Sequence, residues 1–558
     1  MSLGAAGLIA LPILAVLASL LQPGAGAWAH LASTALGSYV VNTALLAAGV
    51  AAGVISIGVL SAWLVTAYRF PGQRVLEWAL MLPLAVPAYV MAYAYTDWLQ
   101  FTGPVQTALR AATGWQAREY WFPEIRSLPG AVAMLALALY PYVYLIARTA
   151  FRDVSRSALE AGRLAGYTAW GSFWQVALPL ARPAIAAGTA LALMETLADF
   201  GTVSYFALEV FTTGIFKAWL SMGDSAAAGQ LSACLLGFVI AVLALERASR
   251  GRAAYASGLR KPSPPQRLVG MPAVLALAAC AAPVVLGFLL PLGLLLHLAW
   301  SDPAARPGAR LFALVGNSFT LAAIAAVVGV LLATAMAYAA RLSRGRLVAA
   351  ANRAAALGYA IPGAVIAVGV LVPLGRLDNW IADALEAALG IKPGLVLTGT
   401  IVALVYAYLV RFLAVALQTV EAGLAKVTLR MDDAARSLGA TPAATLARVH
   451  VPLLASSLAG AALLLFVDVL KELPATFALR PFNFDTLAIE AYNLAKDERL
   501  AEAAVPSLVI VAVCLAPLLW VTKRYFQATR PKNPAATSRP RGRRSSARSA
   551  DCGRAPRH

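Results

Sequence analysis

The amino-acid sequence predicts an all-α membrane protein of about 12 transmembrane helices, arranged as two repeated six-helix bundles. Three observations lead to this fold class. Of the 558 residues, 60% are apolar and only 13% are charged, against about 25% charged residues in a soluble domain. The apolar residues gather in runs long enough to cross a bilayer. The second half of the chain repeats the first at a nearly constant offset.

A helix needs about 20 apolar residues to cross a bilayer, because lipid offers no partner for an unpaired backbone amide. Candidate crossings lie near 3–21, 40–67, 75–95, 129–150, 183–207, 231–246, 272–299, 316–340, 349–373, 394–417, 453–473 and 503–522. The first is followed by Gly24-Ala25-Gly26-Ala27, as a cleavable signal peptide would be, but no basic residue precedes it. We therefore favour a retained helix, with cleavage as the alternative.

The Lys and Arg residues indicate how the crossings are oriented. With a cytoplasmic amino terminus, inner loops hold about three times as many of them as outer loops, which is the positive-inside distribution. This count assigns Arg411 to the inner loop 411–448. The net charge of +19 is thus mostly explained by topology. We expect both termini in the cytoplasm and no nucleic-acid partner, although the basic tail leaves contact with nucleic acid or anionic lipid as an alternative.

The repeat divides the chain into two copies of one unit. An offset of 273 pairs Gly166 with Gly439, and an offset of 275 pairs Pro87 with Pro362. Six crossings per copy is an even number, so the two copies have the same orientation. The expected domains are a first six-helix unit at 1–246, a basic cytoplasmic linker at 247–267, a second six-helix unit at 268–524 and a disordered basic cytoplasmic tail at 525–558.

The best-matched parts of the repeat are two cytoplasmic segments, 160–179 and 433–452, which we name the first and second elbow. Each predicts a short amphipathic helix, a Gly turn, a second short helix and a Pro at the next membrane helix. The matched residues are Glu160, Ala161, Gly162, Gly166 and Pro179 in the first elbow, and Asp433, Ala434, Ala435, Gly439 and Pro452 in the second.

The elbows resemble the coupling loop of the permease subunits of binding-protein-dependent ABC importers. That loop reads Glu-Ala-Ala, three residues, Gly, nine residues, Ile-x-Leu-Pro. The first elbow departs from it at Gly162 and Val176, and the second at Asp433, Val449 and Val451. The resemblance implies that each elbow docks in a groove of an ATPase subunit, hence two copies of that subunit. Amphipathic loop helices lying on the membrane surface are the alternative.

The chain contains no Gly-x-x-x-x-Gly-Lys-Ser/Thr phosphate loop. We therefore expect a permease rather than an enzyme, with no cofactor bound by this chain and ATP used by the partner subunit. The four Cys and four His residues are scattered along the chain. They offer neither a disulfide framework nor a nucleophile–base constellation for an intramembrane enzyme.

Ionisable side chains in the membrane are costly and mark a functional site by default. Those expected to line the translocation pathway are Glu195, Asp199, Asp468, Lys471 and Glu472. Within each copy two acids are four residues apart, so we expect them on one helix face in the outer half of the bilayer. Glu195, Asp199, Asp468 and Glu472 could then converge as transient ligands of a hard cation such as ferric iron. A proton relay or a structural pair with Lys471 is the alternative.

The runs 194–205, 211–219, 471–476 and 480–488 resemble iron(III) permeases with both bundles fused in one polypeptide. The resemblance implies a multi-pass protein of the bacterial inner membrane that receives ferric iron from a periplasmic binding protein. Fused permeases for thiamine and for aminoethylphosphonate share this architecture and are the alternatives. An ion-coupled secondary carrier would also have repeats with buried acids, but it would not need the elbows.

Overall fold

The computed structural model describes residues 2–22, 27–116, 119–154, 160, 162, 164–250, 265–343, 345–390 and 394–529. Residues 1–518 form one compact unit, and a second unit, 519–558, includes the end of the last helix. In the described ranges strand structure is confined to β1 (Tyr68–Arg69) and β2 (Gln266–Arg267), which pair in parallel. Eleven described helices are long and apolar enough to cross a membrane, or up to twelve if one bent pair counts as a span. The all-α membrane class is confirmed.

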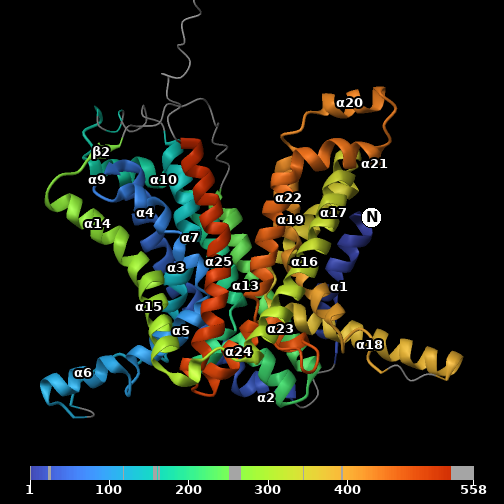
Figure 1. Ribbon diagram of the computed structural model, residues 1–558, viewed down its shortest axis with the longest axis horizontal. Helices are drawn as coiled ribbons and strands as arrows, with labels where there is room; N and C mark the ends of the chain where they lie inside the picture. The colour runs from blue at the N-terminus through green and yellow to red at the C-terminus, as the bar shows by residue number, and fades with distance from the viewer. Residues whose placement is uncertain are drawn as a thin grey trace, which may run out of the picture. The chain divides into compact units, whose positions relative to one another are not determined.

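The first half of the chain, from α1 to α13, is drawn in blue to green in Figure 1. Its helices are α1 (Ser2–Ser19), α2 (Ala27–Thr34), α3 (Leu36–Ala67), α4 (Gln73–Ala79), α5 (Ala88–Leu99), α6 (Pro104–Thr113), α7 (Leu128–Asp153), α9 (Ala169–Ser172), α10 (Leu178–Ala198), α11 (Gly201–Tyr205), α12 (Phe211–Phe216) and α13 (Ser225–Arg250). Three further turns are η1 (Leu82–Ala85), η2 (Phe173–Ala177) and η3 (Lys217–Ser221).

The second half repeats this order. Its helices are α14 (Met271–Val284), α15 (Leu290–Ser301), α16 (Ala309–Leu342), α17 (Arg346–Ala356), α18 (Gly363–Leu389), α19 (Ile401–Leu424), α20 (Leu429–Ser437), α21 (Pro442–Thr445), α22 (Val451–Leu470), α23 (Pro474–Leu479), α24 (Leu487–Lys496) and α25 (Leu500–Thr529). Its further turns are η4 (Val285–Leu289), η5 (Pro303–Ala305), η6 (Leu357–Ala360) and η7 (Leu446–His450). By position α3 corresponds to α16, α7 to α19, α10 to α22 and α11 to α23.

The third crossing of each half is broken at a proline, which corrects the continuous segments expected at 75–95 and 349–373. Pro87 stands before α5 and Pro362 before α18. In the first half the chain bends by 90° at this break. Proline has no N–H to continue a helix and holds the preceding residue in an extended conformation. Val86 and Ile361 are both extended, with ψ of 110° and 126°.

The first helix of each half packs against the other half. α1 lies against α17 and α18, and also against α13 of its own half, while α14 and α15 lie against α3 and α5. The contact between α1 and α18 is close, since a Cβ on Gly369 would lie 2.4 Å from the carbonyl oxygen of Pro12. Each half of the sequence therefore contributes its first helix to the bundle formed by the other half.

Tight helix contacts hold the elements that carry the site. α3 packs along α7, and a Cβ on Gly49 or Gly53 would lie 2.8 Å from Val132 or 2.7 Å from Ala136. Small residues four apart let two membrane helices approach closely, where dispersion rather than the hydrophobic effect drives association. α7 in turn packs on α10, as α19 packs on α22. These two pairs bring the ionisable residues together between the halves.

Candidate functional site

Helices α10 and α22 both break beside their acidic residues. α10 ends at Ala198, so Asp199 stands outside it in an extended conformation. The Asp199 carboxylate accepts hydrogen bonds from the backbone N–H groups of Thr202 and Val203, at 3.0 and 3.2 Å. It thereby caps the first turn of α11.

Glu472 plays the same role in the second half. α22 ends at Leu470, and the Glu472 carboxylate accepts from the backbone N–H groups of Ala475 and Thr476, both at 2.9 Å. The expectation that the paired acids share one helix face is therefore wrong. Only Glu195 and Asp468 remain inside α10 and α22, because Asp199 and Glu472 satisfy the unpaired amides at the start of the next helix.

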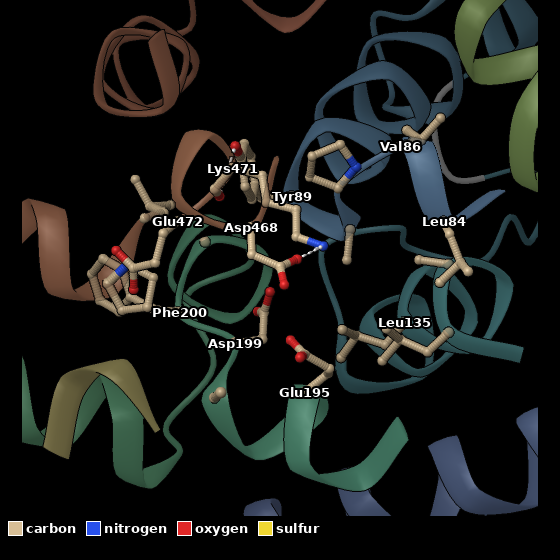
Figure 2. A pocket seen from close by; sticks show the side chains of 18 of the residues that line it. Leu84, Val86, Tyr89, Leu135, Glu195, Asp199, Phe200, Asp468, Lys471 and Glu472 are labelled. Carbon is tan, nitrogen blue, oxygen red and sulfur yellow. Dashed lines mark hydrogen bonds and ion pairs between the residues drawn. The ribbon is translucent and has the colours of Figure 1, made fainter. Parts of the chain in front are cut away.

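All five ionisable residues expected in the pathway line one cavity of about 110 Å³, which we name the chamber. Figure 2 shows the carboxylates of Glu195, Asp199 and Asp468 pointing toward one another, whereas that of Glu472 points away from them. The convergence expected from the repeat is thus present for three of the four acids.

Two cations offset these acids. The Lys471 ammonium lies 2.9 Å from the Asp468 carboxylate. Arg411 lies 3.0 Å from Glu472 through Nη1 and 3.8 Å from Glu195 through Nη2. In the part of the chain that the structure describes, no group of three or more His, Cys, Asp or Glu residues could hold a metal ion. The expected metal ligand set is not assembled, because two of its members cap helices and a third is paired with Lys471.

Arg411 corrects the sequence interpretation, which placed it in an inner loop. It lies within α19, and only 8% of its side chain is exposed. The signal was present, since Arg411 is surrounded by the apolar residues of the crossing expected at 394–417. A charge in such a run should be treated as a pathway candidate and not as a topology marker.

A second cavity of about 670 Å³ lies between the halves on the elbow side of the chamber, and we name it the vestibule. Its walls come from α7, α10 and α13 in the first half and from α17, η6, α19 and α22 in the second. Gln418 and Lys426 place it toward the end of α19 that leads into α20. Tyr142 lines both the vestibule and the chamber.

The first elbow is organised by a glycine turn and by aromatic packing. Gly166 has a φ of +85°, in the left-handed region that favours glycine. The ring of Phe173 lies 5.1 Å from that of Trp63 on α3 and 5.2 Å from that of Trp170. Pro179 stands in the first turn of α10. Of the motif residues, Glu160 and Gly162 are described, and Ala161 lies outside the described residues.

The second elbow has the same backbone turn. Asp433, Ala434 and Ala435 lie in α20, and Gly439 follows with a φ of +79°. Pro452 stands in the first turn of α22. Figure 1 places α20 and α21 at the same end of the compact unit as α9. Both elbows therefore face one side.

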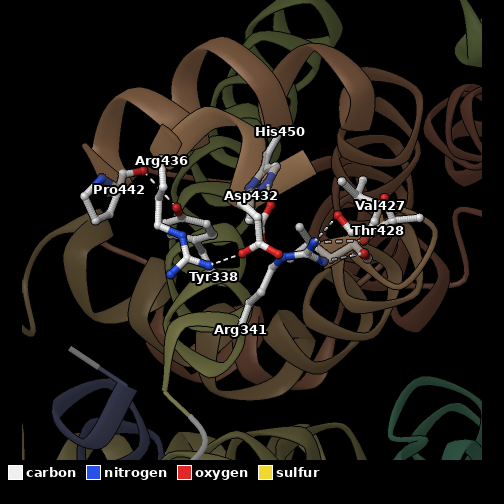
Figure 3. A network of polar contacts seen from close by, with 10 residues as sticks. Tyr338, Arg341, Val427, Thr428, Asp432, Arg436, Pro442 and His450 are labelled. Carbon is white, nitrogen blue, oxygen red and sulfur yellow. Dashed lines mark hydrogen bonds and ion pairs between the residues drawn. The ribbon is translucent and has the colours of Figure 1, made fainter. Parts of the chain in front are cut away.

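The second elbow is held by polar contacts, shown in Figure 3, whereas the first is held by packing between aromatic rings. Asp432 accepts from Arg341 Nε at 2.7 Å and lies 2.7 Å from His450 Nε2. Arg341 also donates to the carbonyl oxygens of Leu424 and Val427. Burial opposes ionisation of Asp432, but the hydrogen bonds from Arg341 and His450 outweigh it and lower the pKa of this carboxyl. The network fixes α20 to the ends of α16 and α19.

We expect Asp432→Ala to destabilise the isolated permease by roughly 3 kcal/mol at pH 7, because it removes the acceptor of the Arg341 Nε–H and leaves the buried His450 Nε2 without its partner. A group whose pKa is lowered on folding stabilises the fold above its unfolded pKa, about 3.9 for Asp. The difference between wild type and variant should therefore shrink as the pH falls below about 4. Thermal unfolding of the purified protein measures both effects.

The adjacent Asp433→Asn is the matched control. Its pair with Arg436 is exposed on both sides, so its loss should change the stability by less than about 1 kcal/mol. Equal destabilisation by the two variants would contradict a structural role for the Asp432 network.

Comparison with known proteins places these features in a family. The family model described as binding-protein-dependent transport system inner membrane component matches residues 54–248, which include the first elbow. The chain is 25% identical over 492 residues to the Fe(3+)-transport system permease protein FbpB 2 of Haemophilus influenzae, covering 87% of this chain and 90% of that protein. It is 30% identical over 192 residues to YvgM of Bacillus subtilis, a permease protein named for molybdenum transport, covering 33% of this chain and 80% of that protein.

The sulfate transport system permease protein CysT of Escherichia coli is 30% identical over 150 residues, covering 27% of this chain and 51% of that protein. The match to the Haemophilus protein runs along nearly the whole chain, so it includes both repeated units. The chain belongs to the family of binding-protein-dependent transport system inner membrane components and is a fused, two-unit permease of an ABC importer.

Proposed function

We propose that this permease carries ferric iron, delivered by a periplasmic substrate-binding protein and driven by two copies of an ATPase subunit. The observation that carries the proposal is the charge of the chamber, where four carboxylates stand against two cations. Carboxylate oxygens suit a hard, highly charged cation. An excess of negative charge also works against oxyanions such as sulfate and molybdate. The relatives named for sulfate and for molybdenum transport match only part of the chain.

The relative named for Fe(3+) transport supports the proposal, because it matches both units of the chain. In this proposal the ion is cargo and not a resident group, and a pathway whose described residues form no closed ligand set fits that role. Ligands that bind too tightly would retain the ion, and transport needs sites that release it. Asp199 and Glu472 shape the chamber through their caps, while Glu195 and Asp468 face the cargo.

The proposed membrane arrangement follows from the elbows. The side that carries α9, α20 and α21 faces the cytoplasm, where each elbow docks on one ATPase subunit. α11, α12, α23 and α24 then face the periplasm and receive the binding protein. The two units at 1–246 and 268–524, the cytoplasmic linker and the cytoplasmic tail keep the assignments made from the sequence, with both termini in the cytoplasm. The chain itself binds no cofactor, and ATP is used by its partner.

The test is uptake by the complete transporter in proteoliposomes, with the permease, the ATPase subunit and the binding protein. We expect ATP-dependent uptake of radiolabelled iron and none of sulfate or molybdate. Uptake of an oxyanion, or of thiamine or aminoethylphosphonate, in place of iron would overturn the proposal.

We further expect Glu195→Gln combined with Asp468→Asn to lower iron uptake by about a hundredfold while leaving membrane insertion intact, since it removes the two carboxylates that remain free of helix caps. Asp383→Asn, on the exposed part of α18, is the control and should transport normally. Normal uptake by the double variant would reduce Glu195 and Asp468 to structural roles.

A further inference from the structure

The chamber and the vestibule are divided by contacts that join the two halves. Glu195 lines the chamber and Tyr359 lines the vestibule. The Tyr359 hydroxyl donates to Glu195 Oε1 at 2.7 Å. Glu195 comes from α10 in the first half, and Tyr359 from η6 in the second. This bond therefore lies between the two cavities and joins the halves at the same point.

Arg411 reinforces the same boundary. Its guanidinium lies between Glu472 in its own half and Glu195 in the other, at 3.0 and 3.8 Å. The exposed fractions of these side chains are 8% for Arg411, 1% for Glu472 and 23% for Glu195. A buried guanidinium needs such compensation, because an isolated charge in this environment is very unfavourable. Of its two carboxylates, the one across the halves is the more distant and the more exposed.

The environment of Arg411 is only partly satisfied. Its Nε–H is buried without a hydrogen-bond partner among the described residues. Buried polar groups are normally paired, and an unpaired donor indicates a strained or functional arrangement. The guanidinium is thus held by its two acids but not fully bonded, as expected of a side chain that must release one of them.

Gly363 makes the ion pair possible. It is the first residue of α18, and a Cβ at this position would lie 2.6 Å from both Arg411 Nη1 and Glu472 Oε1. No side chain fits there without moving the pair. Gly375 lies in the same helix, and a Cβ added there would meet nothing within 4 Å. The two glycines provide a matched test and control.

We propose that Arg411 is the specificity-determining residue of the pathway, a tethered cation that occupies the carboxylates in place of the cargo and closes the chamber toward the vestibule. When the halves separate, Glu195 leaves Arg411 and Tyr359 and becomes available to a cation. The release of Glu195 does not favour the binding of an anion, since it exposes a negatively charged carboxylate. The inference rests on the proposed translocation pathway, but it does not require that the cargo is iron.

The experiment measures leak through the complete transporter in liposomes without ATP, with rubidium ion as the cation probe and chloride as the anion probe. We expect Arg411→Gln to raise the rubidium leak about tenfold or more, because it removes the plug and leaves a chamber that concentrates cations. Gly363→Ala should raise it to a smaller extent, and Gly375→Ala should match the wild type. The chloride leak should stay at the wild-type level in all variants.

The outcomes separate the possibilities. A rubidium leak in Arg411→Gln and Gly363→Ala equal to that of the wild type would overturn the inference. Equal rises for rubidium and chloride would also overturn it, because they indicate a collapsed bundle and not the loss of a cation-selective closure. If Arg411→Gln folds poorly, Arg411→Lys tests the inference in its place. It keeps the positive charge, so its rubidium leak should stay close to that of the wild type. If the transporter carries another cargo but the Arg411→Gln and Gly363→Ala variants leak rubidium as expected, the iron proposal is refuted and the inference about Arg411 stands.

Discussion

Replacing both Gly166 and Gly439 with valine should abolish ATP-driven uptake while the permease still inserts in the membrane. Both glycines have a positive φ, +85° and +79°. A side chain in this region is unfavourable by about 1–2 kcal/mol, and a β-branched residue is an outlier there. Two such strains do not unfold a large bundle. The turns instead leave the left-handed conformation, which reorients the short helices that each glycine joins.

The consequence is loss of coupling. If each elbow is the contact for an ATPase subunit, a reoriented elbow no longer matches the groove that receives it. We expect co-purification of the ATPase subunit to fall sharply and uptake to fall by about a hundredfold. Gly114→Val is the matched control, since Gly114 has a φ of +74° and a Cβ there would meet nothing within 4 Å. Gly114 follows directly after α6, and Figure 1 places α6 at the end of the compact unit opposite α9, α20 and α21, so this change should leave ATPase binding unchanged. Normal uptake in the double variant would count against coupling through the elbows.

The second large effect is expected from Glu472→Leu. This change removes the cap of α23, including a hydrogen bond of 2.8 Å from the Thr476 hydroxyl, and the nearer counter-ion of Arg411. Removing one partner of a buried ion pair destabilises a protein by roughly 3–5 kcal/mol, because the remaining charge loses most of its compensation. After this change Arg411 keeps only Glu195, at 3.8 Å. Denaturation of the purified permease in detergent measures the loss.

A double variant separates the ion pair from the cap. Glu472→Leu combined with Arg411→Met replaces both charges by apolar groups, and such replacements are often close to neutral in stability. We expect it to recover most of the lost stability but not transport. Glu502→Leu is the control, since its pair with Arg499 lies at the surface, where ion pairs contribute little to stability. If the double variant is no more stable than Glu472→Leu, the cap and not the ion pair dominates.

The sequence predicted most of the fold because lipid imposes simple rules on a chain. Long apolar runs must be helices, and Pro and Gly residues at repeated positions form the same local structure in both copies. The breaks at Pro87 and Pro362 followed the same rules and were missed, because the apolar run continues across each proline. Hydropathy measures whether a segment prefers lipid, and it does not report whether its backbone is straight.

The candidate site was predicted in its residues and missed in its contacts. The acids were recognised because charges are rare in membrane helices. That Asp199 and Glu472 would cap the following helices depended on breaks after Ala198 and Leu470, which are set by tertiary packing. Arg411 was assigned to a loop because the positive-inside rule treats every cation as a marker of topology. Neither the exchange of first helices nor the pairing of Tyr359 with Glu195 leaves a signal in local sequence.

The exchange of first helices has a consequence for biogenesis. α1 is synthesised before its partners in the second half, α17 and α18, which follow more than three hundred residues later, whereas α13 is its partner within the first half. During translation α1 can therefore pack on α13, but its face toward α17 and α18 stays exposed to lipid until the second repeat emerges from the ribosome. If the two halves were made as separate polypeptides, each would have to dock its first helix on the other half after insertion before its fold was complete.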